Sequence, residues 1–84
     1  MGISLDQQVI NFVAQYVAQP ASAINDSTTF TSLGINTMTD LIQLISECED
    51  NFGLVYQTGD EKGIITVGDL TALIKRKLAA PPVA

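Results

Sequence analysis

Two short stretches of the sequence decide the fold. The first covers residues 30–54 and reads FTSLGINTMTDLIQLISECEDNFGL, and the second covers residues 66–70 and reads TVGDL. Within the first stretch, apolar residues recur at intervals of about three or four, the period of one helix face. These residues are Met38, Leu41, Ile42, Ile45, Cys48 and Phe52. The pattern predicts a helix that starts at Asn36 or Thr37 and ends at Gly53, where a left-handed cap is expected.

Two other segments show the same helical period. Ser4, with Gln7 three residues later, is a capping-box start, and Gln19-Pro20 ends that segment because proline disfavours helix in the residue before it. A last helix is expected from Thr66, with Asp69 near the positive end of its dipole. The apolar faces of these two helices comprise Val9, Phe12, Val13, Tyr16 and Val17 in the first and Leu70, Leu73, Ile74 and Leu78 in the last.

The connections between these helices have different compositions. Residues 21–34 are rich in Ser, Thr, Asn and Ala, which favour a long loop, and Ile24, Phe30 and Leu33 are expected to pin that loop on the core. In residues 55–65, Gly59 and Gly63 leave room for at most about one turn of helix. Residues 79–84 contain two prolines and predict a stiff tail or linker stub after a single domain over residues 1–78.

The composition excludes several classes of protein. The chain has 84 residues, with 9 Asp and Glu against 4 Lys and Arg, so its net charge is −5. Contact with nucleic acid requires clustered cations, and the only such cluster in the sequence is Lys75-Arg76-Lys77. We therefore expect no nucleic-acid binding. The sequence contains no apolar run of the 18 or so residues that span a membrane and no basic leader before an apolar block. A cytoplasmic monomer with basic-faced protein partners is expected.

The residues needed for catalysis or metal binding are scarce. The sequence has no histidine, the commonest general base and metal ligand, and its carboxylates do not form a calcium-loop pattern. Cys48 is the single cysteine, and its neighbours Glu47, Glu49 and Asp50 are acidic, whereas a reactive thiol needs basic neighbours. We therefore expect an apolar structural role for Cys48, no metal site and no enzymatic activity.

Three motifs in order resemble the acyl carrier protein family. Phe30-x-x-Leu33-Gly34 resembles the approach to the family's attachment turn, residues 49–54 resemble the exit of its second helix, and residues 66–70 resemble the entry to its last helix. The resemblance covers roughly residues 9–78. It implies an all-α fold, an acyl-carrier-like four-helix bundle with three main helices, a short irregular third element and a long loop between helices 1 and 2.

One position departs from the family pattern. The family esterifies a serine in a Leu-Gly-x-Asp-Ser-Leu turn with 4'-phosphopantetheine, and the matching residues here are Leu33-Gly34-Ile35-Asn36-Thr37-Met38. Counting forward from Gly34 places Thr37 at the attachment position, whereas counting back from Phe52 places Met38 there, and an extra residue near Thr39 reconciles the counts. Three interpretations of Thr37 stay open: a helix cap alone, a slow or vestigial acceptor, and an engineered Ser→Thr change.

The resemblance also implies roles for other residues. Candidates for partner docking are Met38, Asp40, Glu47 and Asp50, although a solvated helix face explains the acidic residues equally well. Candidates for lining an acyl pocket are Ile45, Ile64, Leu70 and Leu73, although these residues are core residues first. The implied partners are basic-faced acyl-transfer, ketosynthase or condensing-type enzymes and a phosphopantetheinyl transferase.

The sequence thus predicts a non-catalytic carrier in fatty-acid, polyketide or nonribosomal-peptide-type thiotemplate synthesis. The implied cofactor is 4'-phosphopantetheine, which holds acyl intermediates as thioesters, but without the serine the chain as written is expected to stay unmodified. The alternative is a docking or regulatory module with a carrier-like fold and no prosthetic group.

Overall fold

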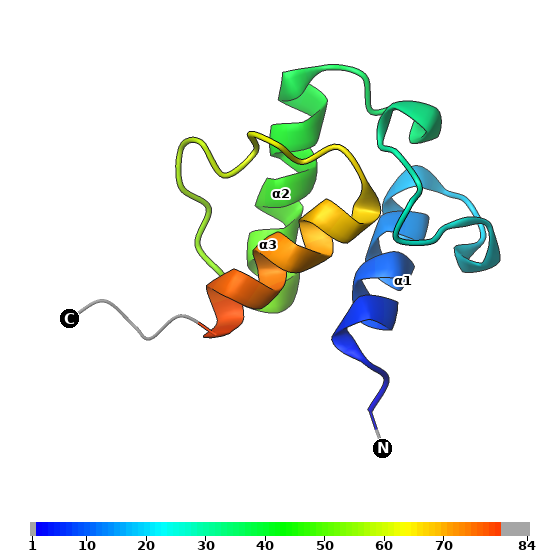
Figure 1. The fold of residues 1–84 in the computed structure, drawn as a ribbon, viewed down its shortest axis with the longest axis horizontal. Helices are drawn as coiled ribbons and strands as arrows, with labels where there is room; N and C mark the ends of the chain where they lie inside the picture. The colour runs from blue at the N-terminus through cyan, green and yellow to red at the C-terminus, as the bar shows by residue number, and fades with distance from the viewer. Residues whose placement is uncertain (1, 80–84) are drawn as a thin grey trace.

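Three α-helices make up most of the structure. The computed structural model describes residues 2–79, which form α1 (Leu5–Val17), α2 (Met38–Phe52) and α3 (Val67–Ala79). Two 3₁₀ turns, Ala21–Ala23 and Thr31–Leu33, lie in the connection between α1 and α2 (Figure 1). Within residues 2–79 the only β pairing is an isolated bridge between Thr29 and Thr66. The prediction of an all-α fold is confirmed, and the predicted tail lies outside the described residues from residue 80 onward.

Side-chain caps fix where the helices begin. The Ser4 hydroxyl accepts a hydrogen bond from the Gln7 backbone N at 3.2 Å and caps α1, as predicted. The Thr37 hydroxyl accepts one from the Asp40 backbone N at 3.1 Å and caps α2. Thr66 and Asp69 cap α3 reciprocally, since each side chain accepts from the other's backbone N, at 3.2 Å and 3.0 Å respectively. These caps satisfy backbone N–H groups that have no partner inside the helices.

The first two helices end in left-handed residues. Gly53 has φ 72° and donates its backbone N–H to the Glu49 carbonyl, which confirms the predicted cap of α2. Ala18 plays the same part after α1, with φ 57°. A left-handed conformation is uncommon for a residue with a side chain, and α1 therefore stops shortly before Gln19-Pro20.

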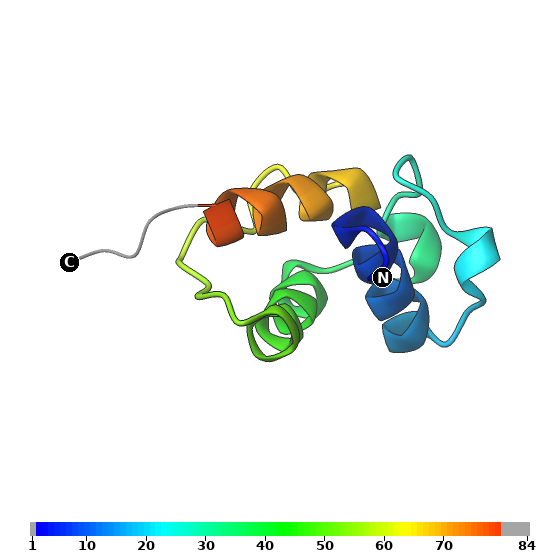
Figure 2. The ribbon, with the colours of Figure 1, turned by 90° about the horizontal axis from the view of Figure 1, so that it is seen from below.

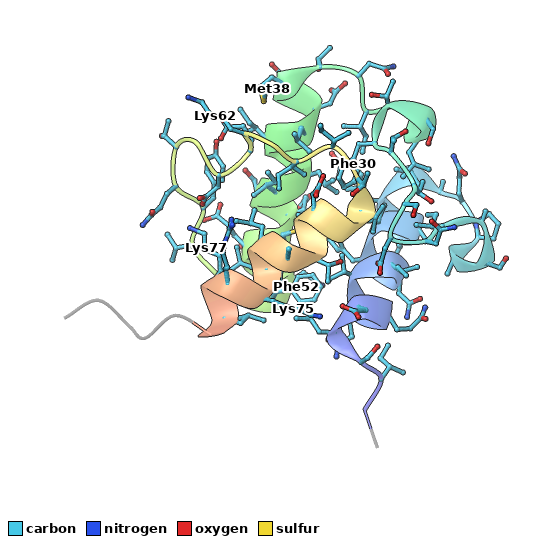
Figure 3. All side chains as sticks on the ribbon, viewed as in Figure 1. Phe30, Met38, Phe52, Lys62, Lys75 and Lys77 are labelled. Carbon is cyan, nitrogen blue, oxygen red and sulfur yellow. The ribbon has the colours of Figure 1, made fainter. Side chains whose placement is uncertain are left out.

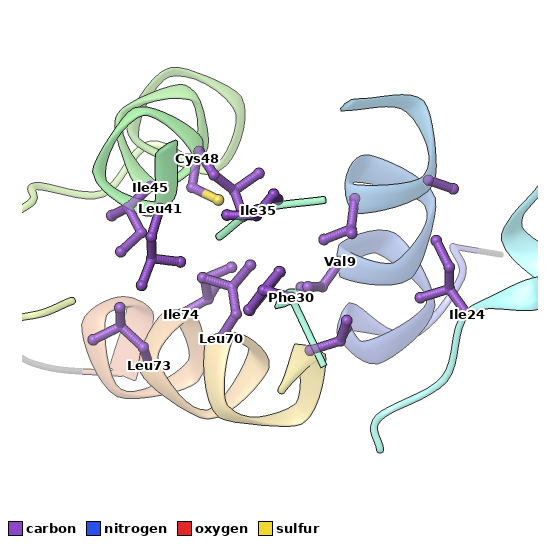
Figure 4. Packing of buried hydrophobic residues seen from close by; sticks show 14 of the residues in the cluster. Val9, Ile24, Phe30, Ile35, Leu41, Ile45, Cys48, Leu70, Leu73 and Ile74 are labelled. Atoms are coloured by element: carbon purple, nitrogen blue, oxygen red, sulfur yellow. The ribbon is translucent and has the colours of Figure 1, made fainter. Parts of the chain in front are cut away.

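The helices enclose one apolar core. Figure 2 shows α3 above α1 and α2, and Figure 4 shows the labelled side chains of α2 and α3 pointing toward one another. Ile24 and Phe30 from the first connection are buried and Leu33 is half-buried, which confirms their predicted anchoring role. The buried apolar residues are Val9, Val13, Ala14, Ile24, Phe30, Ile35, Leu41, Leu44, Ile45, Cys48, Leu54, Val67, Leu70, Leu73 and Ile74.

Several positions differ from the predicted apolar faces. Tyr16, assigned to the apolar face of the first helix, is 37% exposed, and Ala14 and Val67 are buried although they were not assigned to a face. Leu44 is fully buried although it was not assigned to the α2 face, whereas Met38 and Leu78 are 53% and 47% exposed. Met38 is the first residue of α2 and Leu78 lies in the last turn of α3, so neither is covered by a facing element. The face that α2 buries is therefore centred on Leu41, Leu44, Ile45 and Cys48.

The connection between α2 and α3 has no helical residue. The segment contains successive hydrogen-bonded turns over residues 57–64, in which Gly59 and Gly63 have φ 102° and 82°. Both values lie in the left-handed region that glycine enters without steric cost. The third element is irregular, as predicted, and the three α-helices of the described residues are the three main helices of the predicted bundle.

Candidate functional site

Thr37 occupies an exposed corner between the first connection and α2. The preceding turn has Gly34 at φ 89°, and the Ile35 backbone N donates to the Phe30 carbonyl at 2.9 Å. Ile35 is buried, whereas Asn36 and Thr37 are exposed. The turn is therefore anchored from below by Ile35, and it holds the Thr37 hydroxyl at the surface, at the N-terminus of α2.

A small hollow lies beside Thr37. Its volume is about 180 Å³, and its walls come from the first connection, the first turn of α2 and the second connection. The lining residues are Phe30, Thr31, Ile35, Asn36, Thr37, Met38, Leu41, Ile64 and Ile65. Most of these side chains are apolar, so the hollow suits an uncharged group that enters beside the Thr37 hydroxyl.

The predicted acyl-pocket residues do not gather around this hollow. Ile64 lines it and is half-buried. Ile45, Leu70 and Leu73 lie in the closed core, each no more than 2% exposed, and Figure 4 shows them packed between α2 and α3. Two of the residues that do line it, Phe30 and Leu41, were recognisable in the sequence only as core residues. Their role as a pocket wall depends on how the two connections fold.

The predicted docking residues are all exposed, but they lie on different sides of α2. Met38 borders the hollow beside Thr37, at the end of α2 that Figure 3 shows farthest from the C-terminal end of α3. Asp40 and Glu47 are seven residues apart, about two helical turns, and so share one flank. That flank faces Tyr16 of α1. The pKa of Tyr16 is raised mainly by burial and to a smaller extent by the charges of Glu47 and Asp40. Asp50 and Glu47 line a separate groove between α1 and α2.

Charged and polar side chains hold the second connection in place. The Tyr56 hydroxyl donates a short hydrogen bond to Glu61, whose carboxylate also accepts from the Gly59 backbone N at 3.0 Å. The Tyr56 backbone N donates to Glu49 of α2 at 2.8 Å. The side-chain hydrogen bond between the Tyr56 hydroxyl and Glu61 raises the pKa of Tyr56 to about 12 and lowers the pKa of Glu61. This cluster fixes the segment that ends at Ile64, a wall of the hollow.

A salt bridge ties the same connection to α3. Asp60 and Lys77 approach to 2.6 Å, and the side chain of each is only 18% exposed. Burial by itself raises the pKa of Asp60, but the hydrogen bonds from Lys77 and from the Gln57 backbone outweigh it, so the net pKa is lowered. Lys77 thus anchors the loop to the last turns of α3 (Figure 3).

Cys48 lies inside the bundle and has no exposed surface. Burial, together with the nearby charge of Glu47, raises the pKa of its thiol to about 12. The thiolate is the nucleophilic form of cysteine, and at neutral pH this group stays a thiol. The structure therefore agrees with the predicted apolar role of Cys48.

Residues 2–79 contain neither a membrane-spanning helix nor a metal-binding cluster. None of the helices in this part of the chain is both long and apolar enough to cross a bilayer. Nor do three or more His, Cys, Asp or Glu side chains of these residues gather as a metal-binding group. The hollow beside Thr37 and the grooves along α1 are thus the candidate sites that the described residues provide.

Comparison with known proteins gives the same family as the motifs. The chain is 34% identical over 71 residues to the acyl carrier protein of Streptococcus thermophilus, which covers 84% of this chain and 92% of that protein. Identity is 32% over 71 residues with the acyl carrier protein of Streptococcus pyogenes serotype M3, with the same coverage. No protein-family model matches the chain.

A solved structure has the same fold. The acyl carrier protein from Thermotoga maritima superposes with a TM-score of 0.68 at 24% identity, covering 84% of this chain and 82% of that one. That likeness supports the fold alone, whereas the sequence identity to the streptococcal proteins shows the family. On that identity and coverage, this chain belongs to the acyl carrier protein family.

Proposed function

We propose that this chain is a non-catalytic acyl carrier whose residue 37 is the attachment position for 4'-phosphopantetheine. The observation that carries the proposal is the exposed Thr37 residue, whose hydroxyl caps α2 beside a hollow of about 180 Å³ lined by apolar and polar residues. Family membership supplies the class of cargo, acyl groups. When attached, the prosthetic group supplies a terminal thiol that holds such groups as thioesters.

The residues around position 37 fit this group in part. The Thr37 oxygen accepts a hydrogen bond from Asp40 N, so the cap uses an oxygen lone pair and leaves the hydroxyl proton available for removal. Met38 and Ile65 are exposed apolar residues at the rim of the hollow, 53% and 63% exposed. They would shield an apolar chain that lies along the surface, and Leu41 and Ile64 would receive its nearer atoms.

Two features of the turn do not fit. The Thr37 methyl group crowds the oxygen that has to attack a phosphorus in line, and small misplacements in such a geometry slow reaction strongly. Asn36 contributes no charge, whereas the family's turn carries an aspartate at that position. We therefore propose that the chain as written stays unmodified, and that the methyl group is the main obstacle.

The partners follow from the same proposal. An acidic carrier with a net charge of −5 attracts basic-faced enzymes by long-range electrostatics. We propose acyl-transfer, ketosynthase or condensing-type enzymes and a phosphopantetheinyl transferase as partners, with Met38 and Asp40 nearest to the attachment point. The cytoplasmic location stays a prediction.

Intact-mass spectrometry after incubation with a promiscuous phosphopantetheinyl transferase and coenzyme A tests the attachment position. The variants are Thr37→Ser, Met38→Ser and, as a control without a hydroxyl, Thr37→Ala. We expect the unaltered chain and Thr37→Ala to keep their masses and Thr37→Ser to gain one prosthetic group. Serine caps helices at least as well as threonine, so Thr37→Ser retains the fold, which circular dichroism checks.

The other outcomes identify which part of the proposal fails. Loading of the unaltered chain, absent in Thr37→Ala, means that Thr37 is the attachment residue but its methyl group is no obstacle. Loading of Met38→Ser alone moves the attachment position by one residue. If no serine variant is loaded, the carrier function proposed here is wrong, and a docking module without a prosthetic group replaces it.

A further inference from the structure

The outer face of α1 carries no charged side chain. Its exposed residues are Gln7, Gln8, Asn11, Gln15 and Tyr16. The one acidic residue of this helix, Asp6, forms a salt bridge with Lys75 at 2.9 Å, and the helix has no basic residue. The solvent face of a helix usually includes charged residues, and this chain has a net charge of −5. The face is therefore an uncharged surface on an acidic protein.

A groove of about 240 Å³ lies along this face. Its lining residues are Ile3, Gln8, Asn11, Phe12, Gln15 and Asn51. We call it the amide groove, because four of these six side chains end in an amide group. Three of the four lie on α1 at intervals of three and four residues and so form one row along the helix. The amide groove adjoins the larger groove lined by Glu47 and Asp50, but none of its own lining residues is charged.

The amide groups of this groove have hydrogen-bonding capacity to spare. A side-chain amide has two N–H donors and one carbonyl acceptor. The Gln8 amide nitrogen donates to the Ile3 carbonyl at 3.0 Å, and the Asn11 amide oxygen accepts from the Gln7 amide nitrogen at 3.0 Å. Within residues 2–79, the Gln8 amide oxygen and the Asn11 amide nitrogen have no protein partner. The groove thus offers acceptors and donors together to whatever covers it.

We propose that the amide groove is the contact between two copies of this chain, which form a weak dimer with α1 packed against α1. A twofold contact brings the same surface patch of both copies together. An amide suits such a contact because it donates and accepts at once and so pairs with another amide. Ile3, which is 52% exposed, and the half-buried Phe12 add apolar surface. The contact does not involve residue 37, so it is independent of the proposed attachment function.

Charge favours this face for contact between copies. Two molecules with a net charge of −5 repel each other, and charged residues are depleted from the centres of protein interfaces. A contact centred on α2 would place the exposed Asp40, Glu47 and Asp50 opposite the same carboxylates of the second copy. The amide groove brings neutral groups to the centre and keeps Glu47 and Asp50 at its border. Salt should therefore strengthen the dimer, because it screens the remaining repulsion.

Nitrogen-15 NMR and sedimentation velocity of the full chain at increasing concentration test the proposal. At low concentration the chain is expected to be a monomer. As the concentration rises, we expect shifts at Gln8, Asn11, Gln15 and Asn51, and a sedimentation coefficient that rises over the same range. Both effects should be larger at about 0.1 M salt than at about 0.01 M, since the screening length falls from about 30 Å to about 10 Å.

Charged variants of Asn11 locate the contact. Asn11 is the middle amide of the row on α1, so in an antiparallel pair it lies close to its counterpart. Asn11→Asp and Asn11→Lys should each weaken the dimer by about fivefold, the repulsion of two like charges in close contact in water. An equimolar mixture of the two variants should recover the association, because opposite charges then meet. Net charge alone would make Asn11→Lys associate more strongly than the unaltered chain.

Gln57→Glu and Gln57→Lys are the matched controls. Gln57 is an exposed amide residue in the second connection, outside the amide groove, and these variants change the net charge in the same way as the two Asn11 variants. Neither should weaken the dimer by more than about twofold, because a charge far from the contact is largely screened. Circular dichroism shows whether each variant keeps its fold.

Four results would overturn the proposal. They are the absence of any concentration-dependent shift, shifts centred on Thr37 and Met38, association that weakens as salt is added, and no recovery in the mixture of Asn11 variants. Association that weakens with salt would mean that acidic α2 of one copy meets the basic end of α3 of another. Thr37→Ala should dimerise like the unaltered chain, so a failure of this proposal and a failure of the attachment function are seen separately.

Discussion

The two connections between the helices differ in how far titratable side chains hold them. The first, residues 18–37, is anchored by buried apolar side chains and by backbone hydrogen bonds to the start of α3. The second, residues 53–66, buries Leu54 but is also held by side-chain hydrogen bonds and a salt bridge whose partners are titratable. Apolar burial and backbone bonding respond little to pH, whereas titratable partners do. The wall of the hollow that the first connection forms should therefore change little with pH, whereas the wall that the second connection forms should respond to pH.

The backbone bonds of the first connection form a short ladder. Phe30 N donates to the Ile65 carbonyl at 3.0 Å, Val67 N to the Thr28 carbonyl at 2.9 Å, and Gly68 N to the Asp26 carbonyl at 2.9 Å. Two of the donors are first-turn N–H groups of α3 and have no partner within the helix. The ladder thus caps α3 and positions the approach to Thr37 at the same time.

The largest expected effect comes from removing the apolar anchor of the first connection. Phe30→Ala deletes a ring that is only 3% exposed and lines the hollow, so we expect the free energy of unfolding to fall by about 3–5 kcal/mol. Urea unfolding followed by circular dichroism measures the loss. Val55→Ala, at a side chain 68% exposed in the second connection, is the control and should change stability by less than about 0.5 kcal/mol. Similar small losses in both would mean that Phe30 is not an anchor.

A smaller effect is expected where the first connection touches α3. An added Cβ at Gly68 would lie 3.0 Å from the Asp26 carbonyl oxygen and 3.2 Å from the Asp26 Cβ. Such crowding costs about 1–3 kcal/mol, and alanine's better helix propensity returns up to about 1 kcal/mol. We expect Gly68→Ala to be about 1 kcal/mol less stable in thermal unfolding and to exchange the Val67 amide faster. If Gly68→Ala is more stable than the unaltered chain, residues 25–28 can move away from the added methyl group without loss of stability.

The sequence predicted the features whose causes are local. Ser4, Thr37 and Gly53 cap helices through hydrogen bonds that span three or four residues, and such short patterns are legible in a sequence. The position of Thr37 at the exposed start of α2 follows from the same cap. Thr37's role as the attachment residue stays a prediction.

The missed features depend on contacts between distant segments. Periodicity gives a face of α2 but not the element that covers it, which is why Leu44 was missed and Met38 was assigned to the buried face. The hollow needs Phe30 and Ile64, which come from two different connections. The sequence likewise contains no signal that pairs Lys77 with Asp60, since neither periodicity nor capping relates a loop carboxylate to the last turns of a helix.

The second connection is expected to loosen at both ends of the pH range. Glu61 has a pKa below its ordinary 4.5, so its contribution is present above pH 4.5 and is lost as the pH falls through the folded pKa. Tyr56 has a pKa raised from 10.0 to about 12, so its contribution is present below pH 10 and is lost as the pH rises toward 12. Hydrogen–deuterium exchange at low pH and the NMR shift of the Gly59 amide at both extremes follow the change.

Tyr56→Phe is the matched variant for this experiment. It removes the hydroxyl that donates to Glu61 but keeps the ring, so the alkaline transition at Gly59 should disappear. The acidic transition should move toward pH 4.5, because the hydrogen bond from Tyr56 is the largest cause of the lowered pKa of Glu61. An unchanged pH profile in Tyr56→Phe would mean that this hydrogen bond does not hold the loop.

The smallest expected effect separates two salt bridges that differ in exposure. Lys77–Asp60 ties the second connection to α3 with side chains 18% exposed, whereas Lys75–Asp6 joins α3 to α1 with side chains 55% and 48% exposed. Ion pairs at the surface contribute about 0.2–1 kcal/mol, and water and salt screen the exposed pair more strongly. We expect Lys77→Gln to cost close to 1 kcal/mol in urea unfolding and Lys75→Gln less than about 0.5 kcal/mol.

The pKa of Asp60 gives a readout that unfolding alone does not. Burial acts to raise this pKa, and the bonds from Lys77 and the Gln57 backbone bring it below 3.8. Removing Lys77 takes away the larger opposing contact while burial stays, so the pKa should rise in Lys77→Gln and stay low in Lys75→Gln. Carbon-13 NMR of the Asp60 carboxyl follows both titrations. If Asp60 titrates alike in both variants, the salt bridge does not anchor the loop, and the hydrogen bonds of Tyr56 with Glu61 and Glu49 remain as its polar anchors.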